Sequence, residues 1–134
     1  MKICAGQVVL LTGASGGIGE FIAREFARLG LDLVLNAYPG AGLEAVRKEA
    51  ELLGVRAVSV ASDLREPGKR RELVREALAA FGRVDILVNN AGVEFNSEYH
   101  GYLVQYYEIT LIILGNLFKT VYFKRSLFYI QITS

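Results

Sequence analysis

The chain has 134 residues, with 15 Lys and Arg against 14 Asp and Glu and a formal net charge of +1. This balance provides no strong field for nucleic acid or an anionic membrane surface, so we expect neither as a partner. No apolar run approaches the roughly 20 residues that span a bilayer, and the single cysteine, Cys4, cannot form an internal disulfide and suits the cytoplasm. Hydrophobic residues make up 52% of the chain, so we expect some apolar surface to serve a homo- or hetero-oligomer.

Two units of strand followed by helix open the chain. The run Gln7 to Leu11 is short, apolar and β-branched, which predicts a buried strand leading into a glycine-rich loop at 12–19. Apolar residues then recur at helical spacing: Ile18, Ile22, Phe26 and Leu29. Gly30 is placed to end this helix. A second strand at 31–35 and a second helix at 43–53, which Gly54 would end, repeat the pattern.

A third unit follows, with a strand at 55–60 and a helix that has Pro67 in its first turn and runs to about Phe81, where Gly82 stops it. The run 85–88 predicts a fourth strand. Strands that alternate with helices of about ten or more residues pair in parallel through right-handed crossovers. The predicted fold is therefore α/β, a Rossmann-like doubly wound parallel sheet in one domain over residues 1–134.

The composition changes after about Glu98: the preceding sequence is rich in Ala, Gly and Arg, and the sequence that follows is rich in Tyr, Phe, Ile and Leu. We expect residues 102–118 to form a largely buried helix. The alternating run 127–133 predicts a fifth strand, after which the fold would be truncated. Residues 99–134 thus form a divergent tail.

The glycine-rich loop, Thr12-Gly13-Ala14-Ser15-Gly16-Gly17-Ile18-Gly19, predicts a phosphate site. Gly13 permits the tight turn, Gly17 lets the backbone come close to a pyrophosphate, and Gly19 allows the helix to pack tightly on the strand. The N-terminus of the following helix offers unpaired N–H groups and the positive end of its dipole. Alone, such a loop could simply turn a corner, but its place between the first strand and helix favours nucleotide binding.

The end of the second strand bears on the choice of coenzyme. It reads Leu35-Asn36-Ala37-Tyr38, and Asp32 lies at the opposite end of the strand. No carboxylate is positioned there to bind a ribose 2′-hydroxyl and repel a 2′-phosphate. No arginine is evident in this stretch that would bind the 2′-phosphate. The sequence favours NADP over NAD.

Several motifs in order carry a resemblance to a known family. The loop at 12–19 matches the pattern TGxxxGIG, Asn89-Asn90-Ala91-Gly92 matches NNAG after the fourth strand, and Asp63-Leu64 follows the third strand. Over residues 5–98 the chain resembles the short-chain dehydrogenase/reductase family, including its 3-oxoacyl-ACP reductase and glucose dehydrogenase-like members. The resemblance implies an NAD(P)-dependent oxidoreductase that transfers a hydride between nicotinamide and a carbonyl or alcohol substrate.

The resemblance also implies which residues contact the cofactor. Around the pyrophosphate and the nearby ribose it places Gly13, Ser15, Gly17, Ile18 and Gly19. It places Asp63 and Leu64 at the adenine ring, and Asn89, Ala91 and Gly92 at the adenosine side and central sheet. Asn89 and Asn90 have a second interpretation, because polar side chains at the end of a buried strand can satisfy loop backbone groups. No metal site is predicted, since His100 has no partner at ligand spacing.

The chain departs from the family at the catalytic residues, which are Asn, Ser, Tyr and Lys. No tyrosine is followed four residues later by lysine, so the phenol whose pKa a nearby cation would lower is absent. Ile113 stands where the Asn is expected, with Asn116 nearby, and Ser134 would be the counterpart of the catalytic Ser. We expect this chain alone to be inactive.

Three hypotheses remain open. The chain could derive from a truncated oxidoreductase. It could be a non-catalytic dinucleotide-binding module or partner subunit that pairs with a full-length relative. It could also be a decayed or misread gene product in which the composition change near Glu98 marks the join.

Overall fold

A parallel sheet of four strands forms the core of residues 3–91. The computed structural model describes residues 3–91, 96–99, 102–113, 118–124 and 127–132, with side chains described over 3–91. The parallel strands are β1 (Val8–Leu11), β2 (Asp32–Ala37), β3 (Ala57–Ala61) and β4 (Ile86–Asn89), in the spatial order β3-β2-β1-β4. Helices α1 (Gly17–Arg28), α2 (Leu43–Leu52) and α3 (Lys69–Phe81) connect them.

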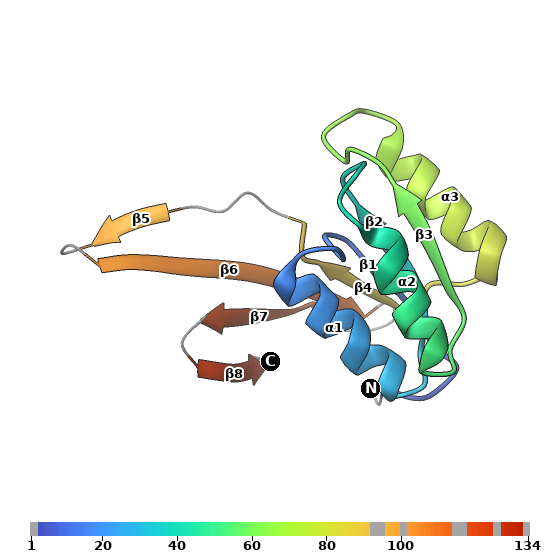
Figure 1. Cartoon of the computed structure of the whole chain (residues 1–134), viewed down its shortest axis with the longest axis horizontal. Helices are drawn as coiled ribbons and strands as arrows, with labels where there is room; N and C mark the ends of the chain where they lie inside the picture. Colours follow the sequence, from blue (N-terminus) through green and yellow to red (C-terminus); the bar gives the residue numbers. More distant parts are fainter. Residues whose placement is uncertain (1–2, 92–95, 100–101, 114–117, 125–126, 133–134) are drawn as a thin grey trace.

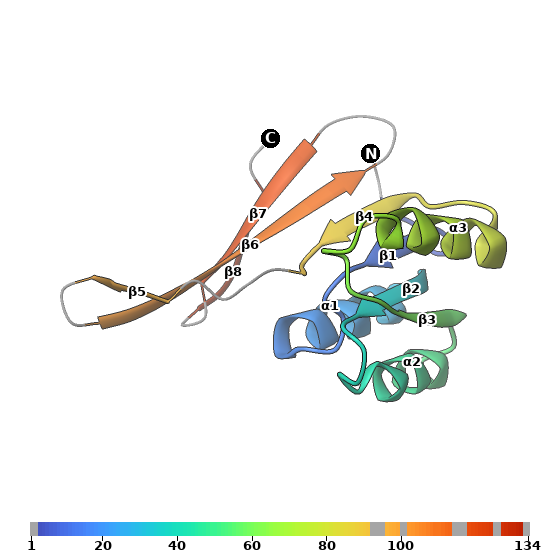
Figure 2. The same ribbon diagram turned by 90° about the horizontal axis from the view of Figure 1, so that it is seen from above.

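The helices cover both faces of this sheet, with α1 and α2 on one face and α3 on the other (Figure 2). Alternate side chains of a strand point to opposite faces of the sheet. Because helices cover both faces, β1 and β2 are buried along their whole length. Val9 and Leu11 join the core under α1 and α2, and Val8 and Leu10 join the core under α3. The doubly wound α/β prediction is confirmed for the part of the chain that runs from β1 to β4.

The helix ends follow the glycines that the sequence marked. Gly30, Gly54 and Gly82 all have positive φ, at 81°, 95° and 71°, a conformation that side chains with a Cβ rarely adopt. The predicted start of α3 is wrong, because Pro67 precedes the helix and Gly68, at φ +90°, is its N-cap. β2 extends beyond the predicted 31–35, because pairing with β3 continues to Ala37 opposite Ala61.

The helix predicted for residues 102–118 is wrong. Residues Tyr102–Ile113 form strand β6, which lies antiparallel to β4 with Asn89 opposite Thr110. The segment is rich in Tyr, Val, Ile and Thr, which favour strands over helices. Apolar periodicity alone does not distinguish a buried strand from a buried helix, and pairing with β4 decides in favour of the strand.

The remaining strands continue this antiparallel pattern (Figure 1). β5 (Asn96–Tyr99) pairs with β6, β7 (Phe118–Lys124) lies on the other side of β6, and β8 (Leu127–Ile132) lies at the edge beside β7. The strand predicted near 127–133 is thus confirmed for 127–132. This strand is separated from the parallel strands, since β6 occupies the position beside β4.

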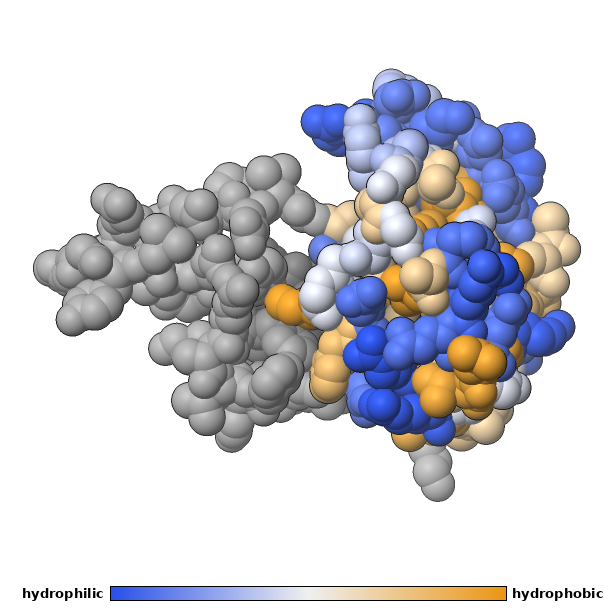
Figure 3. All heavy atoms as spheres, in the orientation of Figure 1, coloured by the Kyte–Doolittle hydropathy of each residue, from blue (hydrophilic) through white to orange (hydrophobic). Residues whose placement is uncertain are grey.

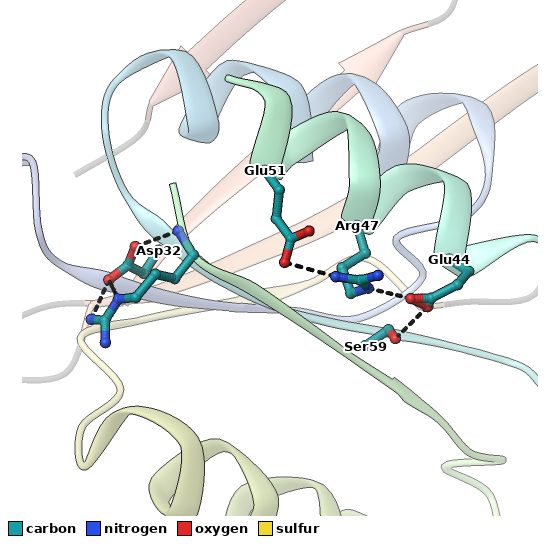
Figure 4. Close-up of polar contacts among 6 residues, drawn as sticks. Asp32, Glu44, Arg47, Glu51 and Ser59 are labelled. Carbon is teal, nitrogen blue, oxygen red and sulfur yellow. Dashed lines mark hydrogen bonds and ion pairs between the residues drawn. The ribbon is translucent and has the colours of Figure 1, made fainter. Parts of the chain in front are cut away.

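Polar contacts join the helical layers to the sheet. On α2, Arg47 forms an ion pair with Glu44 and another with Glu51 at 2.7 Å, and Ser59 of β3 donates a hydrogen bond to Glu44 at 3.2 Å (Figure 4). Polar side chains cover much of the face that carries α1 and α2, and apolar patches lie between them (Figure 3). Among the described residues, no helix is both long and apolar enough to cross a membrane.

Candidate functional site

The carboxyl ends of β1 and β4 are joined by one threonine. The hydroxyl of Thr12 donates to the carbonyl oxygen of Val88 at 3.4 Å and accepts hydrogen bonds from the backbone N–H groups of Asn90 and Ala91 at 3.1 and 3.0 Å. A hydroxyl offers one donor and two acceptor positions, so Thr12 is fully satisfied. It attaches the start of the glycine-rich loop to the segment that follows β4.

Two glycines of the loop are required by close backbone packing. Gly13 has φ +65°, and a Cβ there would lie 3.0 Å from the backbone of Ala91. A Cβ on Gly19 would lie 1.9 Å from the carbonyl oxygen of Gly13. The tight turn predicted for Gly13 is confirmed. The close approach of Gly19 is to the backbone of Gly13 and Ala14 in the loop, rather than to the strand as predicted.

The side chain of Asn90 holds the same turn from the other side. Its Nδ2 donates a hydrogen bond to the carbonyl oxygen of Gly13 at 2.9 Å. The structural interpretation of this residue, that it satisfies a loop backbone group, is therefore confirmed. Asn90 and Thr12 together attach the loop to the segment after β4.

The N-terminus of α1 is open. Gly16 is its N-cap, no side chain caps it, and the first intrahelical hydrogen bond runs from Glu20 to Gly16. The N–H groups of residues 17–19 therefore have no partner within the helix. A Cβ added to Gly16 or Gly17 would meet nothing within 4 Å. Ser15 and Ile18 lie half-buried beside this opening. The arrangement can accept an anion at a positive dipole end.

Asn36, which the sequence analysis did not select as a site residue, connects the loop to β2 and β3. Its backbone carbonyl oxygen accepts a hydrogen bond from the N–H of Ala14 at 2.9 Å. Its side-chain Nδ2 donates to the backbone carbonyl of Val60 at 2.9 Å and to the hydroxyl of Ser62 at 3.0 Å. The residue is only 1% exposed. A polar side chain near the carboxyl end of an apolar strand was the signal that could have identified it, because a buried amide needs partners.

The loop after β3 contains Asp63 and Leu64. Leu64 is partly buried against the core under α3. Both carboxylate oxygens of Asp63 accept hydrogen bonds from Arg65, at 2.8 Å for the pair of Oδ2 with Nη2, and the backbone N–H of Arg65 donates to Oδ1 at 3.0 Å. The side-chain hydrogen bond from Arg65 lowers the pKa of Asp63 below its ordinary value of 3.8. Asp63 is thus a carboxylate at neutral pH.

An arginine does lie near the end of β2, contrary to the expectation from the sequence. The guanidinium of Arg65 lies over the ring of Tyr38, with its carbon 5.9 Å from the ring centre. No local sequence pattern indicates this contact, because Arg65 follows β3 and reaches Tyr38 only when β2 and β3 pair. Asp32 lies at the opposite edge, as predicted, where it binds Arg56.

The other predicted site residues are brought together only in part. Asn89 ends β4 and is exposed, and Ala91 is exposed beside Gly13. Ile113, at the position expected for the catalytic Asn, pairs with Ile86 at the amino end of β4, away from the glycine-rich loop. Gly92, Asn116 and Ser134 lie outside the described residues.

Comparisons with known proteins agree with this geometry. A family model described as short chain dehydrogenase matches residues 7–124. L-rhamnose 1-dehydrogenase (NAD(P)(+)) of a Sphingomonas species is 39% identical over 94 residues, which cover 69% of this chain and 37% of that protein. Ketoacyl reductase HetN of a Nostoc species is 33% identical over 127 residues, which cover 95% of this chain and 44% of that protein.

Two solved structures are similar over the same part. The L-sorbose reductase of Gluconobacter frateurii, complexed with NADPH and L-sorbose, has a TM-score of 0.66 and 38% identity over 71% of this chain and 36% of that chain. A metagenomic short-chain oxidoreductase in complex with NADP has a TM-score of 0.64 and 44% identity over 69% and 42%. The chain spans less than half the length of each of these four relatives. From the family match over residues 7–124, the chain belongs to the short chain dehydrogenase family.

Proposed function

We propose that the carboxyl edge of β1–β4 binds NADP or NAD, and that the chain provides the cofactor-binding part of an oxidoreductase acting on a carbonyl/alcohol pair. The open, uncapped N-terminus of α1, beside a loop held by Thr12 and Asn90, carries this proposal. A pyrophosphate there would receive the N–H groups of the first helical turn and the positive dipole end. The nicotinamide, when bound, supplies or accepts the hydride.

The residues divide by role. Gly13 and Gly19 shape the loop, since backbone lies where their side chains would be, whereas Gly17 leaves open space for the ligand. The proposed cofactor-binding set is Gly13, Ser15, Gly17, Ile18, Gly19, Asp63, Leu64, Asn89, Ala91 and Gly92. The relatives complexed with NADPH and NADP support a nicotinamide dinucleotide as the ligand. An oligomeric assembly and a cytoplasmic location remain predictions from the sequence.

A second candidate function is binding without turnover, as a non-catalytic module or partner subunit. The 134 residues contain no Tyr-x-x-x-Lys pair, and Ile113 lies at the amino end of β4. Without the phenol and its ammonium neighbour, no general acid/base of the family's kind is present to move the substrate proton. Ser134 remains a predicted catalytic residue. We expect this chain to bind the cofactor and to leave a reduced nicotinamide unoxidised in the presence of carbonyl compounds.

The test is a titration of the purified chain with NADPH and with NADH, followed by the fluorescence of the reduced nicotinamide. We expect saturable binding by the native chain. Gly17→Leu fills the open space, so the fold should remain while the dissociation constant rises by about tenfold or more. Arg28→Leu places the same side chain at the other end of α1, and it should bind the cofactor like the native chain.

Circular dichroism and the thermal midpoint of all three proteins establish that they are folded. Binding that is lost in Gly17→Leu and kept in Arg28→Leu supports the proposed site. If the folded native chain binds neither coenzyme, or if Gly17→Leu binds both as tightly as the native chain does, the proposed site is wrong.

A further inference from the structure

One cation at the carboxyl edge is exposed and held in place. The side chain of Arg65 is 79% exposed and lies over Tyr38, the residue that directly follows β2. Tyr38 is itself 61% exposed. The pair is brought together because β2 and β3 are in register up to Ala37 and Ala61. A cation over an aromatic face within about 6 Å is attracted to it.

Asp63 fixes the direction of this guanidinium. Its carboxylate accepts from Nε at 3.0 Å and from Nη2 at 2.8 Å, which occupies one edge of the planar group. Among the described residues, Nη1 has no hydrogen-bond partner. A guanidinium has five N–H donors in a rigid fork and binds phosphate well. Arg65 therefore keeps the N–H donors of Nη1 available to a ligand while its Nε and Nη2 bind Asp63.

The end of β2 contains no group that would oppose a phosphate. Ala37 and Tyr38 stand where a carboxylate would bind a ribose 2′-hydroxyl, and Asp32 is engaged by Arg56 at the other edge of the sheet. We infer that Arg65, held by Asp63 and Tyr38, binds the 2′-phosphate of NADP(H) and makes this coenzyme preferred over NAD(H). The inference rests on the proposed cofactor site.

Opposing charges limit the size of the effect. The carboxylates of Asp63 and Glu66 both act on Arg65, and each would repel a phosphate. Because one charge-assisted contact is gained against this background, we expect a preference of about tenfold rather than several hundredfold. Screening by salt should reduce the preference further, since the site is exposed.

The experiment compares Arg65→Gln with Arg83→Gln in parallel titrations with NADPH and NADH. Arg83 is a matched control, because it is also exposed and also pairs with an aspartate two residues away, Asp85, but at the amino edge of the sheet. Arg65→Gln should raise the dissociation constant for NADPH by about tenfold and change that for NADH by less than about twofold. Arg65→Lys should retain part of the preference, because it keeps the charge and loses the fork.

Each outcome has one meaning. Loss of the NADPH preference in Arg65→Gln alone supports the inference. Equal weakening of both coenzymes, or no change in either while both still bind, overturns it and leaves the cofactor site intact. Failure of the folded native chain to bind either coenzyme overturns the proposed function and this inference with it.

Discussion

The amino and carboxyl edges of the parallel sheet differ in whether their polar groups are satisfied within the chain. At the amino edge, Asp85 accepts a hydrogen bond from the N–H of Val8 at 2.8 Å, and Asp32 accepts one from the N–H of Arg56 at 2.9 Å. These carboxylates also bind arginine side chains, so their charges are satisfied by the chain itself. At the carboxyl edge, the N-terminus of α1 has no side-chain cap.

This difference follows from the topology. A parallel sheet with crossover helices places the start of each helix at the carboxyl ends of the strands, so the positive dipole ends gather at one edge only. Polar side chains at that edge are already engaged within the chain: the Thr12 hydroxyl binds β4 and the segment after it, and the Asn36 amide binds Val60 and Ser62. The backbone N–H groups in the first turn of α1 are not used by these side chains and remain available to a phosphate.

The largest expected effect is that of Gly19→Ala, which would show how far the carboxyl edge depends on close packing. The new Cβ would meet the carbonyl oxygen of Gly13 at 1.9 Å, so loop or helix must shift. We expect the free energy of unfolding to fall by about 3 kcal/mol, measured by urea denaturation.

Gly17→Ala is the comparison for this variant, because its Cβ meets nothing within 4 Å. It should leave the unfolding free energy unchanged or slightly higher, since Gly is a poor helix former. Equal stability of the Gly19→Ala and native chains would show that the loop can move aside.

A smaller effect is expected for Asp85→Asn, which tests whether the amino edge serves stability alone. The variant keeps the shape of the side chain and loses the charge that Arg83 and the N–H of Val8 bind. We expect a loss of about 1 kcal/mol of stability at pH 7 and no change in coenzyme affinity. A weakened affinity in a fully folded variant would contradict this separation of the two edges.

The same variant gives a pH dependence of known sign. The hydrogen bond from Arg83, together with that from Val8, lowers the pKa of Asp85 below its ordinary value of 3.8, although burial acts in the opposite direction. A carboxyl with a lower pKa in the folded state stabilises the fold above its unfolded pKa, and the stabilisation is lost as pH falls through the folded pKa. The difference in stability between native and Asp85→Asn chains should therefore shrink on acidification below about pH 4.

The smallest effect is expected for Arg24→Gln. Arg24 pairs with Glu49 at 2.7 Å and connects α1 to α2 on the surface of the helical layer. The pair raises the pKa of Arg24 and lowers that of Glu49, but exposed pairs contribute little because water and salt screen them. We expect little or no change in the thermal midpoint and none in coenzyme affinity. A clear fall in the midpoint would mean that this contact holds the two helices together.

Local patterns accounted for most of the βα units. The glycine stops after α1 and α2, and the apolar faces of the helices, depend on residues three or four apart. The start of α3 was misplaced, because Pro67 tolerates the first helical turn but does not require it. The site was predicted at Gly13, Gly17 and Asp63, where motifs fix the spacing. Asn36 and Arg65 were missed, since the contacts of Asn36 with Val60 and of Arg65 with Tyr38 form only when β2 and β3 pair.

From β1 through β4, the sequence by itself determined the order of the elements, their parallel pairing, and the loop whose glycines permit its turn. These follow from short-range periodicity and from conformations open only to glycine. The tertiary structure alone decided that residues 102–113 form a strand, because an apolar, β-branched run takes its conformation from the strand it pairs with. It also decided that Arg65 meets Tyr38, since that contact exists only when β2 and β3 are aligned in register.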